Sequence, residues 1–476
     1  MDNKLLRDPG LPVANPTTSA WQQPLNRSMI TTTDLPTHQD VVIIGSGITG
    51  CSIAWHLLHH SESLKVTVLD AREICSGATG RNGGRINCTA VQDFDKYTKL
   101  FGREMAARIV RFELAHYQSI KEVVESVGPE LVSKSELRWI NAVYAVFEDS
   151  EVAELRYMLR SFENAFPDLQ GRWKVIGKEE VTTKYEISNA KGALVGEAGA
   201  AWPYRMVTGV FEHLRSSFPE RFSLSSNTPV QSIHKTTDEQ HPYSLTTQRG
   251  TIRATHIFHS TEGHVAHLLP RLRGILVPRR GQMTVQDAHN VVAKDKLQSW
   301  SLMMQGVFDY ATMNTKTGLV YIGGGEQENK DYSMGVPSDA EEDLAALAHL
   351  GGVLPAAFGG KTPCERASHV EVQASWTGIM GFSLDHAPLV GMLPQELLDR
   401  PAGSSTSAEW ISAGYGGYGM VNAFLCGKTV AMMMLGRQDQ YPEIPSVYLI
   451  TESRARALSA RLGRITSWKD HVQAML

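Results

Sequence analysis

Short runs of consecutive apolar residues flank a helically spaced segment near the start of the chain. Residues 41–44 and 66–69 are almost continuously apolar, which is typical of strands buried on both faces of a parallel sheet. Ile48–His60 between them has the spacing of a helix. These segments predict a β-α-β unit within about 30 residues.

Between residues 282 and 323 the pattern changes to alternating segments, which predict an antiparallel sheet with a hairpin turn at 314–318. Helical spacing recurs at 105–127, 151–166, 204–218, 341–354 and 420–435, and strand-like runs at 139–147, 230–234, 243–247, 257–259 and beyond 370. This order predicts an α/β fold whose nucleotide-binding part is interrupted by a sheet-rich part. We expect an N-terminal arm (1–38), a discontinuous nucleotide-binding domain (39–100, 176–278 and 362–440), a substrate-binding domain (101–175 and 279–361) and a C-terminal helical extension (441–476).

Composition excludes several classes of protein. The 476 residues carry 46 basic and 50 acidic side chains, a net charge of −4, so there is no basic footprint for nucleic acid. Residues 1–38 lack the apolar core of a signal peptide, and the apolar run at 430–435 is far shorter than the roughly 20 residues that span a bilayer. We expect a cytoplasmic monomer or homodimer without membrane contact, in which the arm packs across the body or pairs two protomers.

The first glycine cluster joins the first strand to the first helix. It consists of Gly45, Ser46, Gly47, Ile48, Thr49 and Gly50, a Gly-x-Gly-x-x-Gly pattern. The glycines permit a tight turn, a close approach to a pyrophosphate and close helix packing, while the helix N-terminus favours anions. Asp70 ends the second strand, where a carboxylate accepts hydrogen bonds from a ribose. The alternative is a glycine turn in an unrelated α/β protein.

Two further clusters add to this pattern. The second consists of Ser76, Gly77, Ala78, Thr79, Gly80, Arg81, Asn82, Gly83 and Gly84, followed by Arg85. It suits a second phosphate contact and a flat ring lying against backbone, unless it is an ordinary exposed loop. The third consists of Gly414, Tyr415, Gly416, Gly417, Tyr418, Gly419 and Met420. No strand with an acidic end follows it, which argues against a second dinucleotide site and a nicotinamide-dependent reductase or monooxygenase.

Together with the late segment 376–391, these motifs resemble the D-amino-acid oxidase superfamily of FAD-dependent oxidoreductases. The resemblance extends over residues 39–435 and is greatest to fungal members and to gamma-glutamylputrescine-oxidase-like and sarcosine-oxidase-like amine oxidases. It implies a Rossmann-like FAD-binding domain of the glutathione-reductase type, interleaved with an α+β substrate domain built on an antiparallel sheet. It also implies FAD contacts from the three clusters and from Asp70, Ala71, Arg72, Val230, Gly263, Trp376 and Gly378.

Departures from the family pattern concern the cofactor linkage and the substrate clamp. Near Gly378, where sarcosine-oxidase-type members tether FAD through a cysteine, this chain has none, so we expect non-covalent FAD; Cys75 and Cys426 are the candidate tethers otherwise. Met380 stands where many relatives have an arginine. The five cysteines, Cys51, Cys75, Cys88, Cys364 and Cys426, include no Cys-x-x-Cys pair and indicate reduced thiols rather than a metal site.

Aromatic residues near the expected ring are the candidates for catalysis and substrate binding. The catalytic candidates are Tyr310, Tyr415, Tyr418 and Arg81, and the substrate candidates are Trp202, Tyr310, His386 and Tyr415; core packing or flavin support is the alternative for each. Lys316 lies in the hairpin turn and is expected to be solvated. No metal is expected.

The family moves a hydride from a carbon bearing a nitrogen to the flavin, which dioxygen usually reoxidises with release of hydrogen peroxide. We therefore expect an FAD-dependent oxidase acting on an amine, secondary amine or amino acid. The alternatives are a tailoring oxidoreductase of specialised metabolism, acting on a C–N, C–C or C–O bond, and a flavin-binding protein without turnover.

Overall fold

Apolar β-branched residues build a parallel sheet in one half of the molecule. β1 (His38–Ile44) lies between β2 (Val66–Leu69) and β10 (Gly250–His259) and runs parallel to both. This sheet, sheet A, has the order β16-β17-β10-β1-β2-β7, and β9 and β8 extend it antiparallel from β10. The remaining strands are β7 (Phe222–Ser225), β8 (Val230–Lys235), β9 (Tyr243–Thr247), β16 (Leu389–Met392) and β17 (Glu409–Ala413).

The computed structural model describes residues 3–30, 34–292, 297–325, 331–359, 370–404, 406–437 and 444–475.

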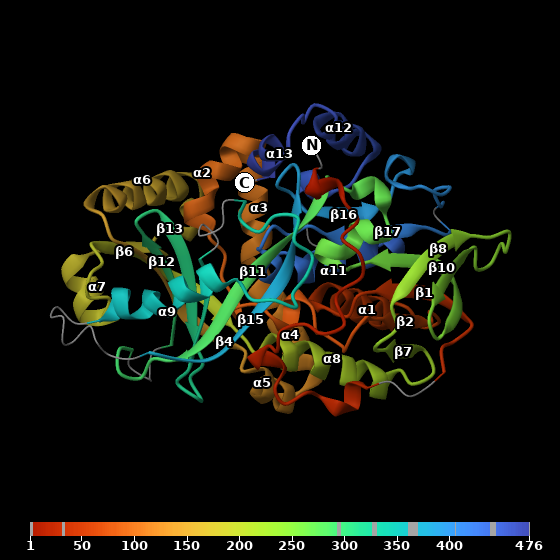
Figure 1. Cartoon of the computed structure of the whole chain (residues 1–476), viewed down its shortest axis with the longest axis horizontal. Coiled ribbons are helices and arrows are strands. Elements are labelled where there is room, and N and C mark those ends of the chain that lie inside the picture. Colours follow the sequence, from red (N-terminus) through yellow and green to blue (C-terminus); the bar gives the residue numbers. More distant parts are fainter. Residues whose placement is uncertain are drawn as a thin grey trace.

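Three helices form a layer against sheet A. α1 (Ile48–His60) packs against α8 (Pro203–Ser217) and α11 (Ala423–Met434), as Figure 1 shows. From Ile48 to Leu58 every residue of α1 is buried, because the helix lies between the sheet and its two neighbours. This placement brings the N-termini of α1 and α11 to the edge of sheet A where the parallel strands end.

The second half is a mixed sheet, sheet B, with the order β15-β11-β14-β13-β12-β4-β6-β3 and β5 paired to β6. Its long strands β11 (Leu276–Asp287) and β15 (Glu371–Ser383) pair antiparallel and cross the middle of the molecule (Figure 1). The hairpin expected at 314–318 joins β13 (Val307–Met313) to β14 (Val320–Gly324). The other strands are β3 (Arg85–Ile86), β4 (Arg138–Val146), β5 (Lys174–Gly177), β6 (Gly192–Ala200) and β12 (Gln298–Met304).

Helices surround sheet B and join it to the first half. α9 (Leu344–Phe358) covers β11, β14 and β15, and a hydrophobic cluster fills the space beneath it. A larger cluster extends from the helices on sheet A to Met283, Tyr321 and Trp376 and so joins the halves. The remaining helices of this half are α2 (Ala90–Phe101), α3 (Arg103–Leu114), α4 (His116–Val127), α5 (Pro129–Ser135), α6 (Asp149–Ala165) and α7 (Lys178–Tyr185).

Two sequence-based expectations differ from this arrangement. The single helix expected at 105–127 is broken at Ala115, beside the buried polar residues Glu113 and His116. His116 accepts the N–H of Leu425 in the first turn of α11. This hydrogen bond connects the break between α3 and α4 to the helices that cover sheet A. Strands β5, β6 and β15 pair in sheet B although the predicted boundaries assign most of their residues to the nucleotide-binding domain. The domain boundaries themselves remain a prediction.

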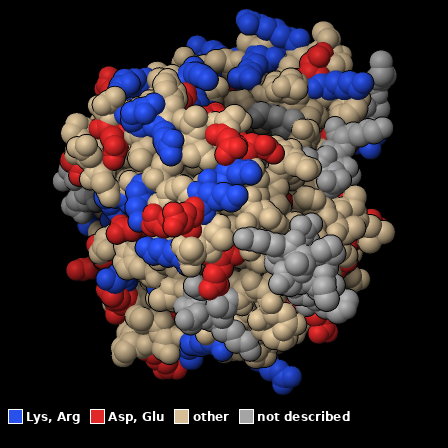
Figure 2. Space-filling model, turned by 90° about the vertical axis from the view of Figure 1, so that its left-hand side faces the viewer, with Lys and Arg blue, Asp and Glu red and all other residues tan. Residues whose placement is uncertain are grey.

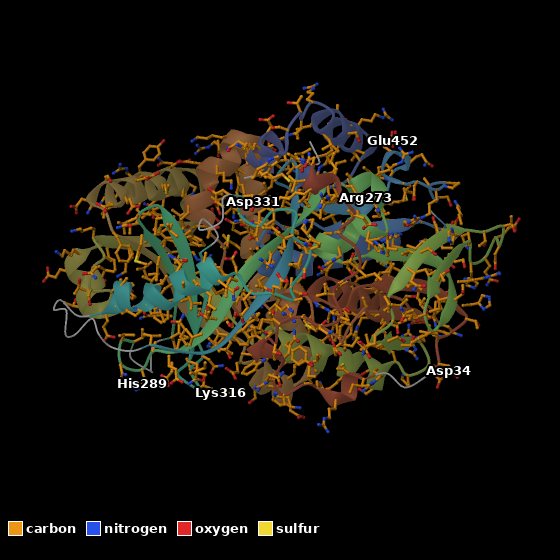
Figure 3. All side chains as sticks on the ribbon, viewed as in Figure 1. Asp34, Arg273, His289, Lys316, Asp331 and Glu452 are labelled. Carbon is orange, nitrogen blue, oxygen red and sulfur yellow. The ribbon has the colours of Figure 1, made fainter. Side chains whose placement is uncertain are left out.

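The N-terminal arm and the C-terminal helices lie together on the body. α12 (Glu452–Leu462) and α13 (Trp468–Met475) occupy the side where both chain ends are found (Figure 1). Asn3 contacts His471 of α13, and Lys4 pairs with Asp331. Figure 3 places Asp331 and Arg273 on this side of the molecule and Lys316 at its lower edge. The arm therefore packs across its own chain, one of its two expected arrangements.

One face of the molecule carries both kinds of charged side chain. Acidic and basic side chains are interspersed over the face in Figure 2. Among the described residues, no helix has the length and apolar character needed to cross a membrane.

Candidate active site

The first glycine cluster forms a close turn between β1 and α1. Gly45 has φ of +107°, and a Cβ atom there would lie 2.5 Å from the carbonyl oxygen of Ser260. A Cβ atom at Gly50 would lie 2.0 Å from the carbonyl oxygen of Gly45. Only glycine fits at either position, so the pattern has the steric cause that the sequence predicts.

Asp70 closes this turn from the end of β2. It accepts hydrogen bonds from the backbone N–H of Ser46 (2.9 Å), from the hydroxyl of Ser46, and from the backbone N–H of Arg72 (3.0 Å). Burial raises the pKa of Asp70, and the hydrogen bonds from Ser46 oppose that shift. The carboxylate also faces the neighbouring cavity.

A cavity of about 230 Å³, the first cavity, runs from this turn to the crossing strands β11 and β15. Most of the predicted cofactor residues line it: Gly45, Ser46, Gly47, Ile48, Thr49, Asp70, Ala71, Arg72, Ser76, Gly77, Ala78, Thr79, Arg81, Asn82, Val230, Gly378, Gly417, Gly419 and Met420. Gly281 of β11 also lines it and pairs with Gly378 of β15. These glycines leave the strands bare of side chains where a flat ring would lie.

The polar groups of the first cavity suit a phosphate-bearing cofactor. Gly47, the N-cap residue of α1, has no side chain to cap the helix, although Thr79 caps the first N–H; a helix N-terminus favours an anion. Within the described part of the chain, the hydroxyl oxygen of Ser76 is buried in the cavity wall without a hydrogen-bond partner. Thr79 accepts the N–H of Ile48 (3.0 Å), which leaves its hydroxyl proton for another acceptor. The buried hydroxyl of Ser76 and a helix N-terminus that begins at a glycine turn fit the FAD pyrophosphate that the resemblance implies.

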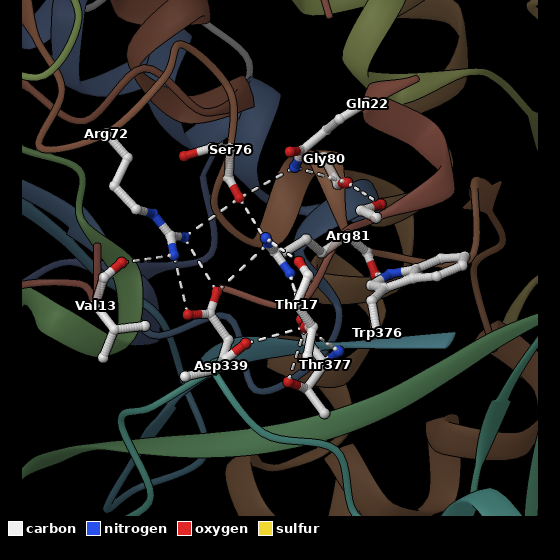
Figure 4. A network of polar contacts seen from close by, with 12 residues as sticks. Val13, Thr17, Gln22, Arg72, Ser76, Gly80, Arg81, Asp339, Trp376 and Thr377 are labelled. Atoms are coloured by element: carbon white, nitrogen blue, oxygen red, sulfur yellow. Dashed lines mark hydrogen bonds and ion pairs between the residues drawn. The ribbon is translucent and has the colours of Figure 1, made fainter. Parts of the chain in front are cut away.

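A buried ion cluster fixes the second glycine segment. Asp339 pairs with Arg72 (2.9 Å) and lies 3.3 Å from Nε of Arg81, as Figure 4 shows. Arg81 also donates to the carbonyl oxygens of Ser76, Thr377 and Thr17 at 2.7–2.8 Å. The guanidinium of Arg81 is thus occupied in joining three segments, and this geometry adds no support to its predicted catalytic role.

Glu262 organises the third glycine cluster. Its carboxylate accepts the backbone N–H groups of Gly414 (2.9 Å), Tyr415 (3.1 Å) and Gly381 (3.0 Å). Two of these N–H groups follow β17 and the third belongs to β15. The side chain of Glu262 therefore holds these two segments together beside the first cavity. Burial raises the pKa of Glu262 to about 7, although the three N–H groups oppose this shift.

We expect Glu262 to make the stability of the apoprotein depend on pH. Because its pKa is about 7 when folded, against 4.5 ordinarily, the folded chain holds a proton that the unfolded chain loses. Stability relative to the Glu262→Gln variant should therefore fall by about 2 kcal/mol between pH 5 and 8. Urea unfolding of both proteins across this range measures the effect. A constant difference between them would contradict the shifted pKa.

A second cavity of about 370 Å³ adjoins the first. The two share six lining residues: Asn82, Tyr310, Met380, Tyr415, Gly417 and Met420. Of the remaining candidates, Gly83, His386, Gly416 and Tyr418 line the second cavity. The structure thus brings Tyr310, Tyr415, Tyr418 and His386 together around one space beside the predicted ring site.

Arg85 is a partly buried cation in the wall of the second cavity. It donates to the hydroxyl of Ser301 (2.8 Å) and to the carbonyl of Trp300, and it lies over the ring of Tyr310 (5.5 Å). Among the described residues no carboxylate pairs with it, and its Nε atom has no hydrogen-bond partner. Burial lowers its pKa to about 10, so it remains charged at neutral pH. A partly buried cation without a counter-ion among the described residues attracts an anionic group.

Two neighbouring glycines leave the space that the side chain of Tyr310 occupies. A Cβ atom at Gly83 would lie 2.7 Å from its ring, and one at Gly323 would lie 2.6 Å from its hydroxyl. Its hydroxyl also contacts the sulfur of Met283 (3.2 Å). Tyr310 therefore stands at the junction of the cavities in one orientation.

The wall of the second cavity formed by α2 carries a carboxylate. Asp93 accepts the hydroxyls of Thr89 and Tyr418, and burial raises its pKa. Nearby, Tyr97 donates to the buried Glu113 (3.0 Å), whose pKa burial and Asp93 raise to about 7. The second cavity is therefore polar on this wall and cationic at Arg85.

Several predicted residues line neither cavity. Trp202 is buried and donates to the carbonyl of Trp21 (2.6 Å), so it supports the arm rather than a substrate. Trp376 is fully buried and donates to the carbonyl of Arg81. The glycines that line neither cavity are Gly50, Gly80, Gly84, Gly263 and Gly414. Cys75 and Cys426 are buried away from both cavities, and Cys364 lies outside the described residues.

Glu262, Asp339 and Asp93 are not among the residues that the sequence predicts for the site, and Arg85 enters the sequence pattern only as the residue after the second glycine cluster. The sequence offers a signal for Glu262, because this residue directly precedes the predicted Gly263 and follows the end of β10 by three residues. Asp339 and Asp93 have no local motif that marks them.

Comparison with known proteins agrees with this geometry. A family model described as FAD dependent oxidoreductase (DAO) matches residues 40–433. Gamma-glutamylputrescine oxidoreductase of Escherichia coli (strain K12) is 22% identical over 418 residues, 85% of this chain and 86% of that protein. Sarcosine oxidase subunit beta of Rhizobium meliloti (strain 1021) is 24% identical over 390 residues, 81% of this chain and 82% of that subunit. Both organisms are bacteria, so these relatives do not support the expected affinity to fungal members.

The fold of this chain also matches that of solved structures. The crystal structure of glycine oxidase from Geobacillus kaustophilus matches with a TM-score of 0.66 and 16% identity, covering 88% of this chain and 99% of that one. The α/β fold expected from the sequence, a Rossmann-like nucleotide-binding domain interleaved with a domain built on an antiparallel sheet, is confirmed, with the one difference that β4 and β12 run parallel in the second sheet and make it mixed. The chain belongs to the DAO family of FAD-dependent oxidoreductases.

Proposed function

We propose that this protein oxidises the C–N bond of an amino acid or of an amine that bears an anionic group, with non-covalent FAD. The chemistry supplied by bound FAD is acceptance of a hydride at N5 from the carbon that bears the nitrogen, and we propose dioxygen as the final acceptor, with release of hydrogen peroxide. The supporting observation is the junction of the two cavities at Tyr310 and Tyr415. This arrangement supports a substrate site beside the strands that would hold the flavin ring.

The residues of the second cavity have separate tasks in this proposal. Arg85 binds the anionic group of the substrate, since it has charge and an unused donor but no counter-ion. Tyr310 and Tyr415 form the walls that orient the substrate and keep water from the reacting carbon. Tyr415 is held by Thr49 (3.0 Å) and Ser412 (2.9 Å) through its hydroxyl, so its ring cannot turn freely. We name no catalytic base, because an amine that binds deprotonated needs none.

The position of the cysteines supports non-covalent binding. Burial raises the pKa of both Cys75 and Cys426, so neither is a reactive thiolate, and neither lines the first or the second cavity. Acid precipitation should therefore leave FAD in the supernatant. Yellow colour on the precipitated protein would contradict this.

Anaerobic reduction tests the proposal as a whole. Simple amines, neutral amino acids and acidic amino acids are each mixed with the FAD-loaded protein, and loss of flavin absorbance is followed, then peroxide after admission of air. Bleaching by a carboxylate-bearing amine and not by the corresponding amine without the carboxylate is the expected result. Bleaching by NADPH, or by no amine or amino acid, would contradict it.

Replacing Arg85 should weaken binding of such a substrate much more than it slows turnover. Removal of one partner of a buried charge pair costs about 3 kcal/mol, so we expect Arg85→Met to raise KM about 100-fold, and Arg85→Lys less. Steady-state kinetics with the best substrate measure both constants. The control is Lys316→Met, which removes an exposed cation of the hairpin and should leave KM unchanged. An equal KM for Arg85→Met and wild type would exclude Arg85 as the anion site.

A further inference from the structure

The arm passes along the first cavity and then along the second glycine segment. Gly10, Leu11 and Pro12 line the first cavity together with Asp70, Arg72 and Val230. Residues 17–22 follow the segment 76–84, as the close view in Figure 4 shows for Thr17 and Gln22. The family model begins only at residue 40, so these contacts lie outside the part of the chain that it matches.

Ion pairs and a hydrogen bond hold the first stretch over the cavity. Asp8 pairs with Arg273 (2.6 Å) and His267 (3.0 Å), and the carbonyl of Gly10 contacts His264 (3.1 Å). His264 and His267 themselves line the cavity. The stretch 10–12 is therefore fastened to the cavity rim at both Asp8 and Gly10.

Backbone and side-chain hydrogen bonds hold the second stretch. Thr17 donates its N–H to the carbonyl of Asp339 (2.7 Å), and its hydroxyl accepts the N–H of Thr377 (2.9 Å). Ser19 donates to the carbonyl of Gly80 (2.7 Å), and Trp21 donates its indole N–H to the carbonyl of Asn82. These partners belong to the ion cluster and the glycine segment that border the first cavity.

Two glycines of the segment are shaped to the arm. A Cβ atom at Gly84 would lie 2.9 Å from the ring of Trp21, and one at Gly80 would lie 2.8 Å from the side-chain nitrogen of Gln22. The ring of Trp21 in turn stacks on Tyr321 of β14 at 3.8 Å. Side chains of the arm therefore pack as closely against the rest of the protein as residues of its core do.

We propose that residues 8–22 are a further component of the FAD site: residues 10–12 cover the cofactor at the rim, and residues 17–22 hold the segment that contacts it. FAD then leaves only when the arm lifts, so the arm retains a cofactor that has no covalent tether. The inference rests on the proposed FAD binding.

The rate of FAD release tests this proposal without reference to turnover. Release from the loaded, full-length protein is followed as the rise of free flavin fluorescence after dilution. We expect Thr17→Val to release FAD about tenfold faster, since it loses the buried hydrogen bonds of the hydroxyl. We expect Asp8→Ala to do the same by several-fold, although Asp8 is part exposed and its loss leaves the core intact. The control is Ser28→Ala, whose hydroxyl contacts Glu212 on the other end of the arm and which should release FAD at the wild-type rate.

Hydrogen exchange provides a reciprocal measurement, because a segment that retains FAD must be stabilised by FAD. Amide exchange in peptides covering residues 8–22 should slow when FAD is added to the apoprotein, while peptides covering α12 should not change. Wild-type release rates for both Asp8→Ala and Thr17→Val, with exchange of residues 8–22 unaffected by FAD, would overturn the proposal. Failure of the wild-type protein to bind FAD would instead overturn the proposed function.

Discussion

Gly50→Ala is expected to destabilise the protein by about 3 kcal/mol and to abolish FAD binding. The added methyl group would lie 2.0 Å from the carbonyl oxygen of Gly45, a backbone atom that moves only with the whole turn. Shifting that turn displaces Gly47 and the N-terminus of α1 from the first cavity. Urea unfolding and titration with FAD measure the two effects.

The control is the same substitution in another helix. Gly352 of α9 is exposed, and a Cβ atom there has no neighbour within 4 Å. Gly352→Ala should therefore stabilise the protein by about 0.5–1 kcal/mol and leave FAD binding unchanged, because alanine restricts the unfolded chain. If the two variants had the same unfolding free energy and the same FAD binding, the result would contradict the close packing of α1 on the glycine turn.

Asp339→Ala is expected to cost about 3–5 kcal/mol of unfolding free energy, the largest effect of any single charge removal proposed for this chain. Asp339 is 2% exposed and lies between Arg72 and Arg81, which are buried as well. Its removal leaves two guanidinium groups in the interior without their carboxylate. The second glycine segment and the arm both depend on this cluster, so FAD binding should weaken at the same time.

A surface carboxylate in a similar pair provides the comparison. Asp168 binds Arg111 at 2.9 Å, but both side chains are more than half exposed. Asp168→Ala should leave the unfolding free energy almost unchanged, because water and salt screen an exposed ion pair. Equal effects of Asp168→Ala and Asp339→Ala would show that the ion cluster is hydrated rather than buried.

The first β-α-β unit is predictable from sequence because local pattern and tertiary environment agree there. The predicted helix Ile48–His60 and strand Val66–Leu69 are confirmed with those bounds. β2 is buried throughout and α1 is buried from Ile48 to Leu58, which favours apolar or small residues; the buried His56 is the exception in α1. The glycine clusters are recognisable for a related reason, since most of their glycines have a positive φ or leave no room for a Cβ atom, although Gly77 and Gly419 have neither constraint.

Strand β6 could not be predicted because its residues reflect the shape of its neighbours. Gly196 leaves space for the ring of Trp173 and Gly199 for that of Tyr117, with a Cβ atom at either position within 2.1 Å of the ring. Glycine and alanine have low β propensity, so nothing local marks Gly192–Ala200 as a strand.

The parts of the site that escape prediction depend on residues distant in sequence. Glu262 has its role only because Gly381 and Gly414 meet beside it, and Asp339 only because Arg72 and Arg81 point to one place. The contact of the arm with the second glycine segment is of the same kind. The sequence indicates the chemistry of such residues but not their partners.

The strand order of sheet A has a consequence for biosynthesis. β1 leaves the ribosome early, yet its neighbour β10 follows at residues 250–259, and β17 only at 409–413. Until then the apolar faces of β1 and α1 have no complete layer to cover them. Pairing between such distant segments is slow, and the waiting chain exposes surface that aggregates. Newly made chains should therefore depend on chaperones until nearly the whole polypeptide has been synthesised.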